Sequence, residues 1–254
     1  MRIGKQDQRS SAISTSTPES ITVRGRDLCG ELIGRTDFTS YFWLLVTGQI
    51  PSENQRFFAN AVLTAIAEHG LVPSVVAARM TYAAAPEAFQ GAVAAGLLGC
   101  GTVVLGSAEA AGRFLHELVE SGDDPKAAVA TLRAAKKAIP GFGHPLHAGG
   151  DPRANLLLQL ASERGIEGKY IRALRAVEAV LPEALGRSLP INVNGAIPAV
   201  MLDVGFPLAA LKGLSLLART ASLIAHLNEE TERPIGFILS GEAAAAIAYD
   251  GPEG

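Results

Sequence analysis

Apolar residues recur at intervals of three and four along most of the chain, the spacing that places side chains on one face of an α-helix. Phe58, Val62 and Ile66 follow this spacing shortly after Ser52 and Gln55. A serine followed three residues later by a glutamine is typical of a capping box, which satisfies free backbone N–H groups at a helix start. The pattern therefore predicts a helix that begins just after Ser52.

Glycine and proline mark the ends of further predicted helices. Gly70 is typical of a C-terminal cap, so His69 is expected to end the first helix. Pro73, Pro125 and Pro207 each precede or open another periodic apolar segment, and proline is tolerated in the first turn of a helix. The segment after Pro207 is expected to be the final long helix.

Strand signals are scarce. Residues 21–23, Ile-Thr-Val, are the best strand candidate, and strands and helices do not alternate regularly. We therefore expect an all-α fold with at most one small hairpin.

The uncharged stretch from residue 88 to residue 108 approaches the length of a membrane span. Five glycines interrupt it, and three polar side chains lie within it. We interpret the stretch as a buried helix followed by a glycine-rich loop, which packs at a dimer interface, and we expect no membrane association.

Composition excludes several classes of protein. The chain has 254 residues, of which 48% are hydrophobic and 19% charged, and its net charge is -3. Disorder over most of the chain and a nucleic-acid-binding surface are therefore not expected. Two cysteines are too few for a disulfide framework, and the N-terminus lacks an apolar signal-peptide core, so we expect a cytoplasmic protein.

Standard cofactor motifs are absent. No P-loop, dinucleotide-binding fingerprint or Gly-x-Ser-x-Gly motif occurs. His144 and His147 are three residues apart, but Pro145 between them favours a loop rather than a helical metal-binding pair. We therefore expect no metal and no nucleotide cofactor.

The segment from Pro140 to His147 is the strongest candidate for a binding site. Its two glycines allow close approach of the backbone to a ligand, and His144 lies in the same loop. Asp151 and Pro152 then predict a helix start that would place Arg153 beside this loop. Arginine suits a carboxylate ligand, although a Gly-Pro turn with an incidental histidine explains the pattern equally well.

Gly141-Phe142-Gly143-His144 followed by Asp151-Pro152-Arg153 resembles the G-F-G-H…D-P-R signature of the citrate synthase superfamily. The likeness runs from about residue 21 to residue 238, and the short chain resembles members of the citryl-CoA lyase type. Other matching segments follow in the family's order: Glu68-His69 with Ser74, Asn192-Val193-Asn194, Gly205-Phe206-Pro207, Ala218-Arg219-Thr220, Ala225-His226 and Arg233-Pro234.

The resemblance implies that His69, His144, Arg153 and Arg219 hold the carboxylates and hydroxyl of oxaloacetate or citrate. It also implies a homodimer in which Arg233 reaches into the neighbouring subunit's site. Coenzyme A, as a thioester substrate, would lie against the backbone of Gly141, Phe142 and Gly143.

Two positions depart from the synthase pattern. Val104 stands where synthases have a histidine that acts on the acetyl-CoA enolate, a departure that favours lyase over synthase. Asn194 stands where the family has its catalytic aspartate. An amide does not exchange protons near neutral pH, so Asn194 removes the usual acid–base group.

Three functions follow from the resemblance. The first is citryl-CoA lyase-type cleavage of a 3-hydroxy-3-carboxyacyl-CoA to acetyl-CoA and a 2-oxoacid such as oxaloacetate, with His144 taking the hydroxyl proton. The second is non-catalytic binding of acyl-CoA and polycarboxylates, as an accessory subunit. The third is a citrate or methylcitrate synthase, against which both departures argue.

The expected architecture has two helical domains. Residues 1–112 and 194–254 would form a large domain like that of citrate synthase, and residues 113–193 a smaller inserted domain. The binding cleft would lie between them and close around the ligand.

Overall fold

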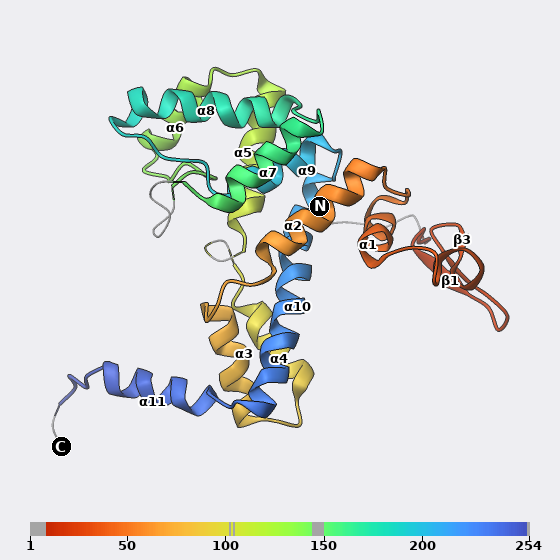
Figure 1. The fold of residues 1–254 in the computed structure, drawn as a ribbon. Coiled ribbons are helices and arrows are strands. Elements are labelled where there is room, and N and C mark those ends of the chain that lie inside the picture. Colours follow the sequence, from red (N-terminus) through yellow and green to blue (C-terminus); the bar gives the residue numbers. More distant parts are fainter. Residues whose placement is uncertain (1–8, 102, 104, 144–149, 253–254) are drawn as a thin grey trace. The chain divides into compact units, whose positions relative to one another are not determined.

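The computed structural model describes residues 9–101, 103, 105–143 and 150–252 (Figure 1). The chain divides into two compact units, Met1–Asn60 and Ala61–Gly254. Each unit is described by itself. The division at residues 112 and 193, expected from the sequence, stays a prediction.

The first unit holds a small antiparallel sheet and the start of a helical region. Strand β2 matches the strand predicted at residues 21–23, but the sheet has three strands rather than one hairpin. The reason is the turn at Arg24 and Gly25, whose φ angles of 50° and 79° suit a tight two-residue hairpin. The elements are β1 (Ser14–Ser16), β2 (Ile21–Val23), β3 (Arg26–Asp27), a π-helical turn (Leu28–Leu32) and α1 (Phe38–Thr47).

Helix α2, Glu53–Ala67, begins as predicted. The backbone N–H of Ser52 donates to Gln55 Oε1 over 2.8 Å, and the N–H of Gln55 donates to Ser52 Oγ over 3.3 Å. These two bonds are the capping box. The helix ends at Ala67, two residues before the predicted end at His69, and Gly70 then turns the chain with a φ of 71°.

The secondary structure of the second unit's described part consists of helices and turns, with one isolated β-bridge between Phe142 and Ile191. Its elements are α3 (Pro73–Ala84), α4 (Phe89–Leu98), α5 (Ser107–Ser121), α6 (Pro125–Ala134), α7 (Pro152–Glu163), α8 (Lys169–Leu185), α9 (Val193–Asp203), a 3₁₀ turn (Leu208–Ala210), α10 (Leu211–Glu232) and α11 (Gly236–Ala246). Together with the first unit, this confirms the predicted all-α class.

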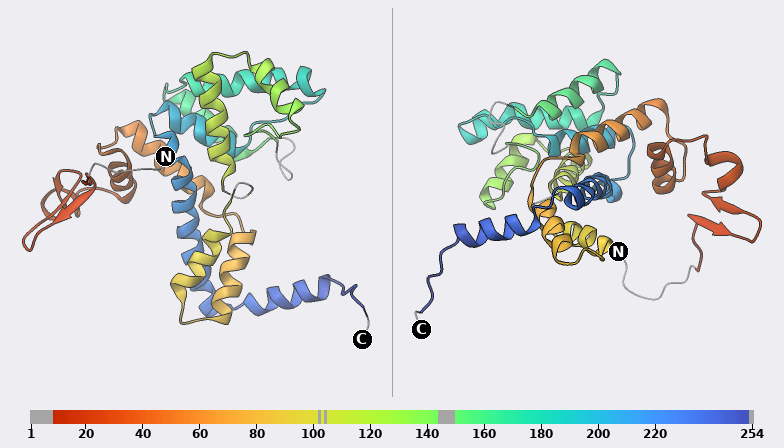
Figure 2. Two further views of the ribbon diagram at one scale, coloured as in Figure 1. Left: turned by 180° about the vertical axis from the view of Figure 1, so that it is seen from behind. Right: turned by 60° about the horizontal axis from the view of Figure 1, so that its bottom comes forward.

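Two groups of helices make up this unit. Helix α9 packs against α5, α7 and α8, while α3 and α4 pack against each other and against α10 (Figure 2). Eight residues of α9 are buried, and Asn194, next to its start, is half-buried. The position of Asn194 is therefore set by the best-buried helix of its group.

Helix α10 differs from its prediction in two ways. It starts at Leu211, after a 3₁₀ turn, and α11 follows it, so it is not the last helix.

The stretch Leu208–Glu232 is also long and apolar enough to cross a membrane. We interpret it as a core helix, because it packs against α3, α4 and α5 and buries two charged side chains, Arg219 and Glu230, among them.

The backbones of Gly141 and Gly195 lie so close that neither residue can carry a side chain. A Cβ on Gly195 would lie 2.5 Å from the carbonyl oxygen of Gly141, and one on Gly141 would lie 2.8 Å from the Gly195 Cα. Gly141 also has a φ of 89°, which favours glycine. The glycine-rich segment therefore packs directly against the first turn of α9.

We predict that Gly195→Ala lowers the free energy of unfolding by about 1–3 kcal/mol, because a Cβ would meet backbone atoms that cannot rotate away. Gly213→Ala is the matched control. A Cβ on this α10 glycine meets nothing within 4 Å, so alanine should stabilise the helix by about 0.5–1 kcal/mol. Urea denaturation checks both, and equal effects would contradict the packing argument.

Candidate functional site

The Gly141–Gly143 segment and the start of α9 form one hydrogen-bonded structure. Asn192 donates its N–H to the Gly141 carbonyl over 3.0 Å and its Nδ2 to the Gly143 carbonyl over 2.6 Å. Its Oδ1 accepts from the N–H groups of Asn194 and Gly195, which caps α9. Two sequence motifs that are fifty residues apart are therefore joined by one asparagine side chain.

Asp151 connects the Asp151-Pro152-Arg153 motif to the start of α9. Its side chain is fully buried, accepts from the N–H of Val193 over 3.0 Å, and pairs with Arg153 through Nε and Nη2. It also caps α7, as predicted. Burial raises the pKa of this carboxyl, but the bonds from Arg153 and Val193 outweigh burial and lower the pKa to about 2.

Arg153 pairs with Asp151, which is bonded to the start of α9. Its side chain is 23% exposed and makes a two-pronged contact with Asp151. A ligand carboxylate would share the guanidinium with Asp151. His144, the other member of this predicted pair, lies outside the described residues, as do His147 and Val104.

A basic hollow of about 520 Å³ opens beside Phe142 and Gly143. Four cationic side chains line it together with apolar ones: Arg133, Lys136, Lys137 and Arg187, with Ile139, Leu185 and Leu189. Sequence reasoning missed these cations. The adjacent pair Lys136-Lys137, directly before the signature, was a usable signal.

Arg219 is a buried cation without a carboxylate partner among the described residues. Its side chain lies on α10 and is 3% exposed. Nη1 donates to Ser222 Oγ over 3.3 Å, and Nε has no hydrogen-bond partner within the part of the chain that the structure describes. The side chain of Ser74, on α3, is also buried. A buried charge left unpaired is costly, so this guanidinium is suited to receive an anion.

The turn that carries His69 is held by the carboxylate of Glu68. Oε1 accepts from the N–H groups of His69 and Gly70, at 2.9 and 2.5 Å. Oε2 accepts from Ser222 Oγ over 2.6 Å and contacts His226 Nε2 at 3.0 Å. Burial raises the pKa of Glu68, but the bonds from Ser222, Gly70 and His226 outweigh burial and lower the pKa to about 2. His69 lies in this turn rather than at a helix end.

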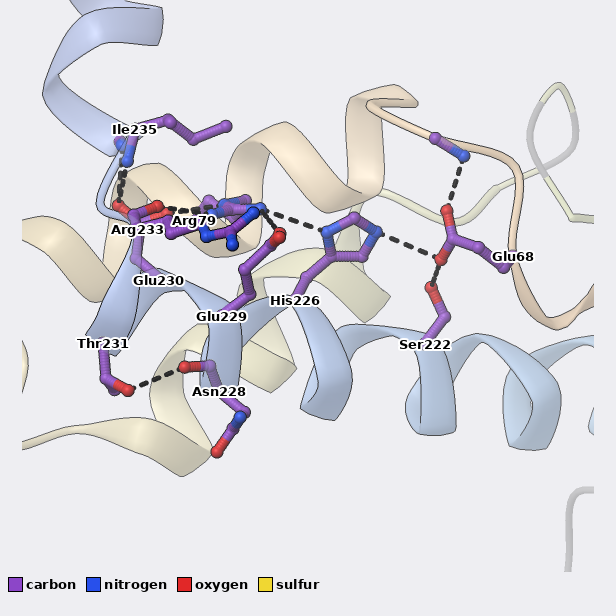
Figure 3. A network of polar contacts seen from close by, with 12 residues as sticks. Glu68, Arg79, Ser222, His226, Asn228, Glu229, Glu230, Thr231, Arg233 and Ile235 are labelled. Atoms are coloured by element: carbon purple, nitrogen blue, oxygen red, sulfur yellow. Dashed lines mark hydrogen bonds and ion pairs between the residues drawn. The ribbon is translucent and has the colours of Figure 1, made fainter.

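A second buried arginine, Arg79 on α3, is fully bonded (Figure 3). Nε donates to Glu230 Oε2 over 2.5 Å, and Nη1 donates to Glu229 Oε2 over 2.8 Å. Nη2 donates to the carbonyl of Arg233 over 3.0 Å. The side chain of Arg233 is exposed, so in one chain this predicted residue takes part only through its backbone. The sequence offered no local signal for Arg79.

The structure thus brings the predicted residues together in two sets. One contains the glycine-rich segment, Asp151 with Arg153, and Asn194. The other contains Arg219 and the His69 turn, joined through Ser222 and Glu68. No cluster of three or more potential metal ligands occurs among the described residues, which include neither His144 nor His147.

The sequence was compared with models of protein families. The model for the C-terminal domain of citrate synthase matches residues 37–236. The chain belongs to the citrate synthase family.

Relatives and solved structures agree with this assignment. An ATP-citrate synthase subunit 1 of Sordaria macrospora is 26% identical over 220 residues, which cover 80% of this chain and 32% of the relative. A citrate synthase of Synechocystis is 27% identical over 202 residues, 77% of this chain and 50% of the relative. The chain therefore spans between about a third and a half of the length of these relatives.

Among solved structures, the chain is similar to citryl-CoA lyase from Hydrogenobacter thermophilus. The TM-score is 0.88 and the identity 30%, over 96% of this chain and 95% of that one. ATP citrate lyase from Methanothrix soehngenii, solved with citrate and coenzyme A, has the same fold. Its TM-score is 0.83 at 24% identity, over 99% of this chain and 43% of that one.

We predict that Asp151→Asn lowers the free energy of unfolding at pH 7 by about 3 kcal/mol, because it breaks a buried ion pair. The folded pKa of about 2 lies below the ordinary 3.8. The ionised carboxyl therefore stabilises the fold above the unfolded pKa, and this stabilisation is lost as pH falls toward 2. The difference between parent and variant should shrink between pH 5 and pH 3 in urea titrations.

Asp203→Asn is the control for this pH dependence. Asp203 caps α8 by accepting from three backbone N–H groups, but burial raises its pKa. Acidification should therefore not remove the stabilisation that Asp203 contributes. A difference for Asp151→Asn that stays constant to pH 3 would contradict the assigned role.

Proposed function

We propose that this chain cleaves a 3-hydroxy-3-carboxyacyl-CoA of the citryl-CoA type into acetyl-CoA and a 2-oxoacid such as oxaloacetate. The observation that carries the proposal is Arg219, a buried guanidinium whose Nε has no hydrogen-bond partner among the described residues. A substrate carboxylate would supply the missing negative partner. The likeness to a citryl-CoA lyase over nearly all of both chains supports the same function.

The basic hollow is suited to the phosphates of coenzyme A. Four cations from two segments, residues 133–137 and Arg187, would neutralise phosphate groups, while Phe142, Ile139 and Leu189 offer an apolar surface. Phe142 and Gly143 line this hollow. Gly141, the residue before them, contacts Gly195, the neighbour of Asn194 on α9.

The reaction needs one base and one proton donor. His144 would take the proton of the tertiary hydroxyl, and the oxygen electrons would form the new carbonyl. The broken carbon–carbon bond leaves its electron pair on the acetyl thioester as an enolate. Water would protonate that carbon, since the amide of Asn194 has no acidic proton near neutral pH. No metal or nucleotide takes part in this scheme.

A non-catalytic role in binding acyl-CoA and polycarboxylates is the second candidate. It is favoured by Asn194, which removes the acid–base group while Arg219 remains in place. Asn194 argues in the same way against a synthase, which must take a proton from the methyl group of acetyl-CoA. Release of acetyl-CoA from citryl-CoA separates the lyase from the binding protein.

We further propose a cytoplasmic homodimer. Phe237 and Ile238 at the start of α11 are 71% and 59% exposed in the single chain. Arg233 lies four residues before Phe237 and is exposed as well. Light scattering at micromolar concentration should give the mass of two chains, and a monomer that still binds citrate would contradict a shared site.

We predict that Arg219→Met raises the thermal stability of the ligand-free protein and removes citrate binding. Methionine relieves the cost of an unpaired buried charge. Loss of the charged partner should weaken citrate binding by about 2–5 kcal/mol. Arg79→Met is the control, because Arg79 is buried with carboxylate partners, and its loss should destabilise the protein. A destabilised Arg219→Met would indicate a purely structural arginine.

We predict that Asn194→Asp accelerates cleavage of citryl-CoA by about 10²-fold or more, because the carboxyl can deliver a proton to the enolate carbon. The double variant Asn194→Asp with Val104→His should add some condensation of acetyl-CoA with oxaloacetate, since an imidazole can stabilise the enolate oxygen. Thiol release measures condensation. A parent as fast as Asn194→Asp would show that another residue supplies the proton.

A further inference from the structure

His226, on α10, lies between the buried Arg79–Glu230 pair and the half-exposed carboxylate of Glu68 (Figure 3). Its Nδ1 lies 3.3 Å from Arg79 Nη1, and its Nε2 lies 3.0 Å from Glu68 Oε2. The ring is 14% exposed, and a hollow of about 340 Å³ opens beside it. The imidazole thus connects Arg79 with the carboxylate that holds the His69 turn.

The two contacts decide the protonation of the ring. A guanidinium N–H can only donate, so Nδ1 must accept and carries no proton. Nε2 then carries the ring proton and donates it to the Glu68 carboxylate. The arrangement therefore requires the neutral imidazole with its proton on Nε2.

Glu68 transmits this orientation to the candidate carboxylate site. Its Oε1 holds the N–H groups of His69 and Gly70, and its Oε2 holds the hydroxyl of Ser222. That hydroxyl in turn accepts from Arg219 Nη1. Because Glu68 is 52% exposed, it needs a partner to keep one orientation. His226 contacts the same carboxylate oxygen as Ser222 and is such a partner.

The far side of the ring is held rigidly. Arg79 is anchored by Glu230, whose Oε1 accepts from the N–H groups of Ile235 and Gly236 at the start of α11. Both charged side chains of this pair are 2% exposed. The charged groups around His226 are therefore Glu68 before α3, Arg79 on α3, and Glu229 and Glu230 on α10.

We propose that His226 is a positioning residue for the carboxylate site: it transmits the fixed position of the Arg79–Glu230 pair to Glu68, and thereby orients the His69 turn and the Ser222–Arg219 contact. The part that concerns ligand affinity rests on the proposed function, whereas the part that concerns the turn does not.

Three variants and one control test this role. His226→Leu removes both contacts. His226→Gln keeps an acceptor for Arg79 and a donor for Glu68, so it should rescue what leucine loses. Glu68→Gln, at a position that is 52% exposed, removes the carboxylate itself. Asn228→Ala changes an exposed neighbour on the same helix and serves as the control.

The ring proton and the turn are measured directly. Long-range ¹H–¹⁵N spectra, assigned by the signals that His226→Leu removes, should show the proton on Nε2. Hydrogen exchange at the Gly70 amide should be faster in His226→Leu and Glu68→Gln, and unchanged in His226→Gln and Asn228→Ala. A proton on Nδ1, or Gly70 exchange equal in all variants, would overturn the proposal.

Citrate affinity, measured by calorimetry, tests the effect on the site. We expect roughly tenfold weaker binding in His226→Leu and Glu68→Gln, a loss typical of a residue that orients a ligand-binding group, and parental binding in His226→Gln. If the parent itself does not bind citrate while Gly70 responds as expected, the proposed function fails and the positioning role stands. If the parent binds citrate and His226→Leu binds equally well, the positioning role is wrong.

Discussion

The buried carboxylate of Asp151 is the interaction on which the glycine-rich part of the candidate site depends. It caps α7, accepts from the first residue of α9, and holds Arg153 by two hydrogen bonds. An ionised carboxylate without exposure to water is tolerated only when all of its oxygens are bonded. Asp151 satisfies this condition because its oxygens accept from Arg153 at the start of α7 and from Val193 at the start of α9. The same bonds that stabilise the buried charge also hold the two helix starts together.

Two buried arginines in the same unit differ in their partners. Arg79 has two carboxylates and a carbonyl for its donors. Among the described residues, Arg219 has one serine hydroxyl, and its Nε has no partner. Burying an unpaired cation lowers stability. Arg219 is linked to the turn that carries His69 through Ser222 and Glu68, and a ligand carboxylate, as proposed above, would offset this cost.

Local signals made much of the fold predictable. Capping residues such as Ser52 with Gln55, and Asp151 before a proline, act within one turn of the chain, so their pattern is visible in the sequence. The start of α10 was misplaced because a 3₁₀ turn intervenes after Pro207. The small alanine-rich helix α11 shows no apolar periodicity and was missed.

Sequence analysis proposed site residues that lie in short contiguous motifs, and it missed contacts between residues that are far apart in the chain. Arg219 and Asn194 followed from short matching segments. The ion pair between Arg79 and Glu230 joins residues 151 apart, and no local pattern reveals it. The cations of the basic hollow come from two segments that only the fold brings together. Long-range pairing of charges is a property of packing, which a single sequence does not display.

The position of Asn194 determines what its amide can contribute to the reaction. Asn192 caps α9, so Asn194 lies in the first turn, where the helix dipole stabilises negative charge. An aspartate there could take a proton from a methyl group in condensation and return it to the enolate carbon in cleavage. The amide cannot accept a proton, but it can donate a hydrogen bond to an enolate oxygen.

Cleavage and condensation pass through the same enolate in opposite directions, so the missing carboxyl slows both. Condensation must first form an enolate from a weakly acidic methyl group, which requires a base. Cleavage produces the enolate directly, and water can protonate it without a protein group. Under the proposed function, a site with Arg219 to hold the carboxylate and an amide at position 194 would still break the carbon–carbon bond, with water in place of the aspartate for protonation of the enolate.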